Sequence, residues 1–205
     1  MAFLESVTLG VEDLAAADSF YADTFGLGTQ VRLRASDAPT SGFRGFTLSL
    51  LVSQPSTVNN FIAAALDAGA ASLKPAAKQF WGGYSGVVRA PDGTIWKVAT
   101  DAKRDTGPAS IGIDGLALLL GVADMTASKR FYTDHGLGVA KSFGGKYVEF
   151  ATAPDEVKLA LYKRRALAKD AGVSPQGTGS HRLTIGSGAG PFTDPDGFAW
   201  QAASP

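Results

Sequence analysis

The residues that most often bind metals or act as nucleophiles are scarce in this sequence. Its 205 residues include two histidines, His135 and His181, and no cysteine. The absence of cysteine excludes disulfides, Cys-ligated zinc or iron–sulfur sites and thiol nucleophiles. Two histidines are too few for a histidine-rich metal centre. Any chemistry must therefore come from carboxylates, lysines, hydroxyls and aromatic rings, and depends on the elements that position them.

Two predicted strands carry groups of this kind. Because side chains alternate along a strand, Tyr147 and Glu149 share one face of the strand expected at residues 146–151. Lys158 and Tyr162 share a face of the strand expected at 157–162. A Glu149 that faces a cavity could be a general base, although a salt bridge is the more common role. We include Tyr147 and Glu149 among the candidate ligand-binding residues.

Aromatic residues gather just before a glycine-flanked strand. Phe80, Trp81 and Tyr84 lie within five positions of one another. Beside a cavity mouth they could stack on a planar ligand, and they could equally pack in the protein interior.

Charge and hydropathy narrow the functional classes. The 19 basic and 19 acidic residues balance, which argues against a protein that binds the nucleic-acid phosphate backbone. No apolar run is long enough to span a bilayer, and the first residues do not resemble a signal peptide. We expect a cytoplasmic protein with no nucleic-acid or membrane partner.

The chain contains an internal repeat. Leu-Gly-Val-Glu-Asp at residues 9–13 returns as Leu-Gly-Val-Ala-Asp at 120–124, and Phe20-Tyr21 returns as Phe131-Tyr132. Pro-Asp-Gly followed by Trp occurs at 91–96 and again at 195–200. The sequence is therefore divided into two similar halves, 1–104 and 105–205.

Each half is expected to open with a strand and a helix. Asp13 and Asp124 are suited to cap helices that end near Gly26 and Gly136. Another helix is expected at 58–68, and further strands at 31–34, 46–52 and 181–185. Each half lacks elements that the other keeps, so one module of each half is truncated.

The segment 81–98, with its Trp-Gly-Gly-Tyr start and Pro-Asp-Gly turn, resembles the final strands of the glyoxalase/bleomycin-resistance/extradiol-dioxygenase superfamily, the vicinal-oxygen-chelate fold. Residues 9–14 and 159–172 are similar to the family's first strand and to a connector common in it. The resemblance implies an α+β fold of tandem βαβββ glyoxalase-like modules, whose curved mixed β-sheets form a cavity. The family includes lyases, dioxygenases and non-catalytic drug binders, so the fold does not fix the function.

The resemblance also implies where a divalent metal would be held, by His, Gln or Glu on first and last strands. The equivalent positions here are Ser6, Thr47, Lys97, Ala117, His181 and Gln201, with a carboxylate position near Leu159 or Ala160. A lysine repels a cation, and His181 with Gln201 gives fewer than the usual three ligands. We therefore expect no metal and no cofactor.

Lys97 occupies a position where the family commonly has a glutamate. Trp96 and Trp200 alternate with Lys97 and Gln201, so the tryptophans are expected in the core and Lys97 in the cavity. A buried ammonium needs a partner. That partner is either a protein carboxylate, with Glu149 a distant candidate, or an anionic or carbonyl-bearing ligand.

Three functions stay open at this stage. The first is a metal-independent small-molecule-binding protein of the glyoxalase/bleomycin-resistance type, acting alone or as a homodimer. The second is a metal-dependent lyase or dioxygenase with a degenerate site built from His181, Gln201 and Glu149, and the third is an interaction module without a site. No catalytic residue is assigned. The candidate ligand-binding residues are Lys97, Phe80, Trp81, Tyr84, Tyr147, Glu149, His181 and Gln201.

Overall fold

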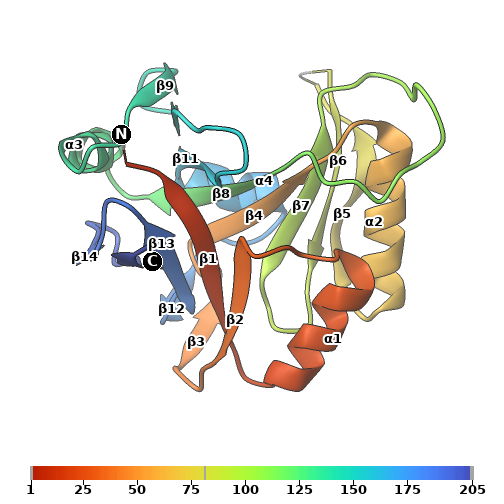
Figure 1. The fold of residues 1–205 in the computed structure, drawn as a ribbon, viewed down its shortest axis with the longest axis horizontal. Helices are drawn as coiled ribbons and strands as arrows, with labels where there is room; N and C mark the ends of the chain where they lie inside the picture. Colours follow the sequence, from red (N-terminus) through yellow and green to blue (C-terminus); the bar gives the residue numbers. More distant parts are fainter. Residues whose placement is uncertain (1, 81, 204–205) are drawn as a thin grey trace.

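The structure is a computed structural model that describes residues 2–80 and 82–203. Its centre is an eight-stranded sheet made of two complete βαβββ units (Figure 1). The first unit is β4 (Phe46–Leu51), α2 (Pro55–Asp67), β5 (Ala71–Lys78), β6 (Tyr84–Arg89) and β7 (Ile95–Thr100). The second unit is β8 (Gly115–Val122), α3 (Met125–Asp134), β9 (Val139–Ser142), β10 (Tyr147–Phe150) and β11 (Lys158–Lys163). The strand order is β5-β6-β7-β4-β8-β11-β10-β9.

A five-stranded sheet combines the two ends of the chain. Its order is β14-β15-β13-β1-β2, with β1 antiparallel to β13 and parallel to β2. The elements are β1 (Leu4–Val11), α1 (Leu14–Thr24), β2 (Val31–Ala35), β13 (Leu183–Ser187), β14 (Phe192–Thr193) and β15 (Ala199–Ala202). The module at the start of the chain, β1-α1-β2, contributes one strand after its helix to this sheet. The module at the end of the chain, β13-β14-β15, has no described helix. Both modules are therefore truncated.

Two smaller features complete the architecture. Strands β3 (Thr40–Gly42) and β12 (Gly177–Gly179) form a short ribbon, and helix α4 (Arg164–Ala171) follows β11. The expected α+β fold of tandem βαβββ modules is confirmed. Each large sheet contains strands from both sides of residue 104. The boundary between the predicted halves 1–104 and 105–205 therefore does not coincide with the boundary between the sheets, and the division into halves stays a prediction.

The helix boundaries follow the expected local signals. Asp13 accepts a hydrogen bond from the Ala16 amide at 2.9 Å, and Asp124 caps α3 in the same way. Gly26 and Gly136 take positive φ angles of 56° and 88° just after the helices, which favours glycine. Helix α2 begins at Pro55, three residues before the expected start, because proline is well suited to a first helical turn.

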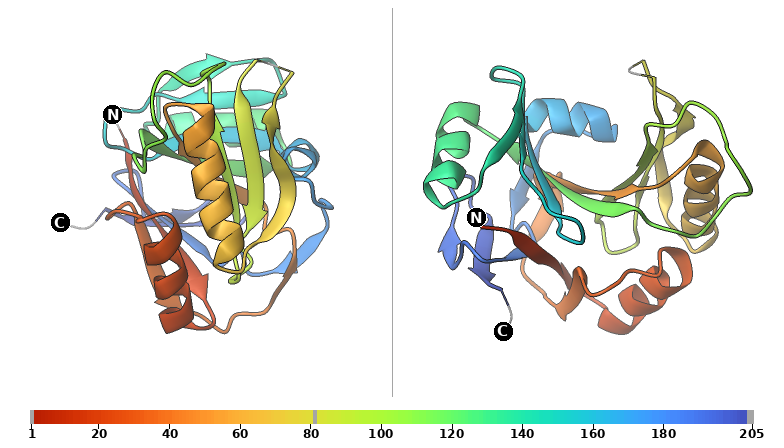
Figure 2. Two further views of the ribbon diagram at one scale, coloured as in Figure 1. Left: turned by 90° about the vertical axis from the view of Figure 1, so that its right-hand side faces the viewer. Right: turned by 45° about the horizontal axis from the view of Figure 1, so that its top comes forward.

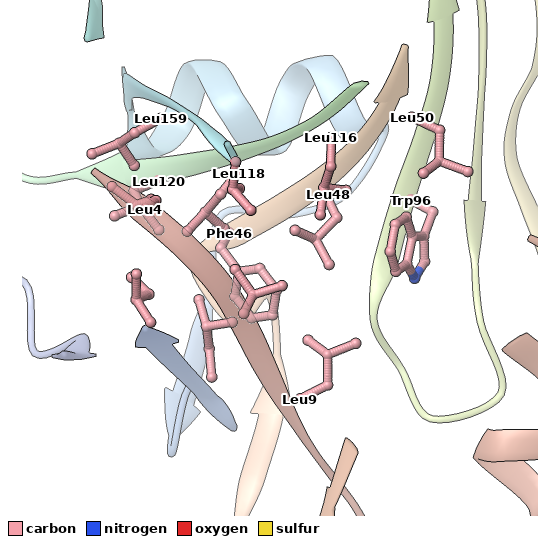
Figure 3. Packing of buried hydrophobic residues seen from close by; sticks show 14 of the residues in the cluster. Leu4, Leu9, Phe46, Leu48, Leu50, Trp96, Leu116, Leu118, Leu120 and Leu159 are labelled. Atoms are coloured by element: carbon pink, nitrogen blue, oxygen red, sulfur yellow. The ribbon is translucent and has the colours of Figure 1, made fainter. Parts of the chain in front are cut away.

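The main core lies between the two sheets and helices α1, α2 and α3. Trp96 has no exposed surface and packs among leucines from both sheets (Figure 3). Its indole nitrogen donates to the hydroxyl of Tyr21 on α1 at 3.2 Å. In the second half Trp200 packs against Tyr132 on α3, with ring centroids 5.2 Å apart. Both tryptophans are therefore core residues, as expected.

Candidate functional site

Four of the positions that the family resemblance implies for a metal lie together on one face of the eight-stranded sheet. Ser49 pairs with Lys97 on β7 and with Ala117 on β8. Leu119 pairs with Thr47 on β4 and with Ala160 on β11. Because cross-strand partners share a face, Thr47, Lys97, Ala117 and Ala160 surround the centre of the sheet. This is the face opposite to Trp96.

Helix α4 packs on this face of the sheet (Figure 2). Its Leu167, Ala168 and Ala171 are at most 2% exposed and belong to a separate apolar cluster that includes Ala117 and Ala160. The two alanines have no side-chain donor atom and leave room for the helix.

Two groups of hydrogen bonds fix α4 in place. The Arg164 guanidinium donates to the Phe43 carbonyl at 2.5 Å and to the Pro175 carbonyl at 3.0 Å. At the other end of the helix, Lys74 donates to the Lys169 carbonyl at 2.8 Å. The helix is therefore an integral part of the structure.

Lys97 has a protein partner that sequence reasoning did not identify. Its Nζ lies 2.8 Å from Asp170 Oδ2 on α4, and the lysine side chain is 16% exposed. Of the two kinds of partner expected for Lys97, the structure has a protein carboxylate, but it is Asp170 on α4 and not the distant candidate Glu149, which pairs with Lys141. With two alanines, one threonine and an ion-paired lysine, the four positions do not fit a divalent metal.

Glu149 belongs to a different polar group on the same sheet. It accepts a hydrogen bond from the Tyr147 hydroxyl at 2.5 Å and pairs with Lys141 at 3.5 Å. Burial disfavours the carboxylate, but the Tyr147 hydroxyl and the charges of Lys158 and Lys141 outweigh it and lower the pKa of Glu149. Burial and the Glu149 carboxylate raise the pKa of Tyr147. Glu149 is thus held as an ion-paired carboxylate.

The five-stranded sheet has an equivalent set of positions. Gly186 pairs with both Ser6 and Gln201, and Thr8 pairs with both Arg32 and Thr184. The positions equivalent to Thr47, Lys97, Ala117 and Ala160 are therefore Ser6, Arg32, Thr184 and Gln201. The residue of β13 in this set is Thr184, whereas His181, the expected counterpart of Thr47, lies before the strand. A guanidinium among two hydroxyls and an amide does not fit a divalent metal either.

His181 lies just before β13 and contacts the backbone. Its Nδ1 is 2.5 Å from the Arg44 carbonyl and its Nε2 is 3.1 Å from the Asp196 carbonyl. The ring stacks on Phe198 with centroids 4.0 Å apart. Both ring nitrogens face carbonyl oxygens, so His181 has no nitrogen free to ligate a metal in this arrangement.

The remaining candidates lie apart from one another. Phe80 is fully exposed at the β5–β6 turn. Tyr84 donates to Asn59 Oδ1 at 3.0 Å and is held against α2. Trp81 lies outside the described residues. Of the candidate ligand-binding residues, the structure brings Tyr147 and Glu149 into direct contact and leaves Lys97, Tyr84, His181 and Gln201 at separate places.

A cavity with a volume of about 920 Å³ lies elsewhere, at one end of the main core. Residues from four segments of the chain surround it, within 22–31, 50–51, 111–116 and 152–158, together with Phe61 of α2. Phe25 and Phe61 line it with ring centroids 6.2 Å apart. The Gln30 side chain donates to the Asp155 carbonyl at 2.7 Å and joins two of the segments.

The rim of this cavity is acidic. Asp23, Asp114, Asp155 and Glu156 border it together with a single base, Lys158. Sequence reasoning missed this site because its walls are loops and strand ends from both halves, and only Phe61 carried a local signal, on the apolar face of its helix.

Two further findings concern all the described residues and not the cavity alone. Within residues 2–80 and 82–203, no three acidic or histidine side chains are grouped in a way that could hold a metal ion. None of the described helices is long and apolar enough to cross a membrane.

The fold has counterparts among solved structures. A mutant of glyoxalase I from Zea mays is 15% identical, with a TM-score of 0.62 over 97% of this chain and 92% of that chain. A second structure of the same enzyme gives 16% identity and a TM-score of 0.59, over 91% and 75%. A putative dioxygenase from Bacillus subtilis is 13% identical, with a TM-score of 0.56 over 90% and 69%. No protein-family model and no curated protein matches the sequence. At these identities the likeness concerns the fold alone.

Proposed function

We propose that this chain, which has the vicinal-oxygen-chelate fold of glyoxalase I, is a metal-independent small-molecule-binding protein of the glyoxalase/bleomycin-resistance type. The observation that carries the proposal is the cavity of about 920 Å³ at the end of the main core. Small-molecule sites are usually preformed concave pockets of roughly 300–1,000 Å³ with mainly apolar walls and a few polar groups.

The lining suits a ligand with a flat apolar body. Phe25, Leu50, Phe61 and Leu116 are each at most 5% exposed and give the cavity a rigid apolar floor. Because Phe25 and Phe61 belong to the packed core, they lose little conformational freedom when a ligand covers them. Polar groups at the rim would orient the ligand.

A metal-dependent reaction has little support in the residues. Glu149 is on β10 of the eight-stranded sheet, Gln201 is on β15 of the five-stranded sheet, and His181 contacts two backbone carbonyls. These three side chains do not converge on one site. The binding function therefore needs no metal, and its ligand is held by packing and hydrogen bonds.

The neutral fluorescent probe N-phenyl-1-naphthylamine tests the proposal, because its emission rises in an apolar pocket. Gly28 borders the cavity and a Cβ atom there would meet no atom within 4 Å, so Gly28→Trp adds a bulky side chain at the cavity without a clash at its Cβ. Gly145, in the β9–β10 turn, has equally open surroundings, and Gly145→Trp is the matched control.

We expect the wild type and Gly145→Trp to bind the probe with the same affinity and Gly28→Trp to bind it at least tenfold more weakly. Equal binding by all three proteins, or no binding by the wild type, would contradict the proposal.

A further inference from the structure

A second cavity, of about 360 Å³, lies between the start of α1 and the turn that joins β6 to β7. It is separate from the larger cavity, and no residue borders both. Two arginines from distant parts of the chain border it, Arg44 just before β4 and Arg182 just before β13. Two positive charges at one small pocket repel each other, so the partners of each guanidinium decide what the pocket can bind.

Arg182 is almost completely buried and is held rigidly. Its side chain is 5% exposed, and its Nη2 lies 2.8 Å from Glu12 Oε1. Its Nε donates to the Ala38 carbonyl at 2.8 Å. The residue has a φ angle of 49°, a conformation that non-glycine residues seldom adopt and that clusters at binding sites. Its charge already has an anionic partner in Glu12.

Arg44 has a less complete set of partners. Its Nη2 donates to the Asp92 carbonyl at 2.6 Å. Its Nη1 is shut off from solvent and has no hydrogen-bond partner, and the same holds for Oγ1 of Thr40, which also borders the pocket. No ion pair of Arg44 occurs in the described part of the chain. A half-buried cation in this state is costly.

The neighbouring carboxylates are already engaged. Asp92 accepts hydrogen bonds from the Tyr21 hydroxyl at 3.1 Å and from the Thr94 hydroxyl at 2.8 Å. Asp13 accepts from the Ala16 amide as the cap of α1, and Glu12 pairs with Arg182. These charges compensate Arg44 at a distance, but none of them supplies an acceptor to its Nη1.

We propose that this pocket binds a small oxyanion, a carboxylate or a phosphate group, between the guanidiniums of Arg44 and Arg182. A guanidinium presents a planar fork of N–H donors that matches both kinds of anion. A small turn of the Arg44 head group brings Nη1 to the anion, and the Thr40 hydroxyl supplies another donor. The pocket has room for a molecule of a few heavy atoms beyond the anionic group.

Thermal unfolding in acetate and in inorganic phosphate tests this site, with chloride at the same ionic strength as the reference. We expect the wild-type Tm to rise with the concentration of at least one of the two anions. The anion that raises it more identifies the chemistry as carboxylate or phosphate. Arg44→Gln should weaken the binding at least tenfold. Arg130→Gln, on the exposed side of α3, should behave like the wild type.

A shift that is equal in Arg44→Gln and the wild type would overturn the proposal, because general salt effects act on both proteins alike. A second measurement needs no variant. In the unmutated protein, phosphate or acetate should move the backbone amide NMR signals of Ala16, Ala17 and Gly93 and leave that of Gly145 unchanged. The absence of such a localised response to both anions would also overturn it.

Discussion

Lys97 Nζ lies 2.8 Å from Asp170 Oδ2, and this ion pair joins β7 to α4 across the face where related folds are expected to hold a metal. The pair is flanked by the apolar contacts of Leu167 and Ala168 with Ala117 and Ala160. The centre of the eight-stranded sheet is therefore structural, and the cavity of about 920 Å³ lies at another place in the molecule.

The ion pair should contribute measurably to stability. Lys97→Met leaves the partly exposed Asp170 carboxylate without its partner. We expect the free energy of unfolding to fall by about 1 kcal/mol. The effect is limited because solvent screens the exposed part of Asp170. The double variant Lys97→Met/Asp170→Asn should recover part of the loss. Urea unfolding of the two single variants and the double variant measures the coupling. Strictly additive losses would show that the two groups do not interact.

Chelators should leave the protein folded. The four positions on each sheet that the family resemblance implies for metal ligands hold alanine, lysine, arginine, hydroxyl or amide side chains, so we expect no divalent ion to contribute to folding. We expect EDTA to leave the Tm unchanged within error. A decrease of several degrees that a divalent ion restores would reveal a metal site that this account lacks.

The two halves should fold only together. β1 pairs with β13 and β4 pairs with β8, so a fragment of residues 1–104 would expose one edge of each large sheet and much of the main core. We expect this fragment alone to lack a cooperative thermal transition, and co-expression with residues 105–205 to restore one. Sharp unfolding of the isolated fragment would instead identify residues 1–104 as an independent domain.

Glu149 should make stability depend on pH. Because its pKa is lower in the folded protein than the ordinary value of 4.5, the folded state binds this proton less readily than the unfolded state. Its contribution is present above pH 4.5 and is lost as the pH falls through the lowered pKa. Unfolding experiments from pH 7 downwards should show a smaller loss for Glu149→Gln than for the wild type. The control Asp67→Asn, at an exposed end of α2, should lose as much stability as the wild type. Parallel curves for all three proteins would contradict the role of Glu149.

Local patterns predicted the elements better than the site. Asp13 and Gly26 mark the ends of α1 through contacts within a few residues, and the alternation around Trp96 correctly placed its ring in the core. The partner of Lys97 could not be found in this way, because Asp170 follows it by 73 positions and meets it only after α4 folds back over the sheet. The two alanines at Ala117 and Ala160 were a signal for this packing, since they leave space for a helix.

The cavity was beyond sequence reasoning for a related reason. Its walls include Phe25, Leu50, Ile113 and Asp155, which come from four segments in both halves. No spacing rule connects segments of this kind, and only the folding of the two sheets brings them together.

The most direct test of the account is the affinity for N-phenyl-1-naphthylamine in metal-free and metal-supplemented protein. The protein is stripped with EDTA, dialysed and titrated with the probe, then titrated again after addition of Mn²⁺, Ni²⁺ or Zn²⁺. Phe25 and Phe61 line the cavity, and the acidic side chains at its rim are not grouped as a metal site among the described residues. The dissociation constant should therefore be the same in every titration and should increase at least tenfold in Gly28→Trp. Binding that appears only when one of these metals is present would contradict a metal-independent binding function.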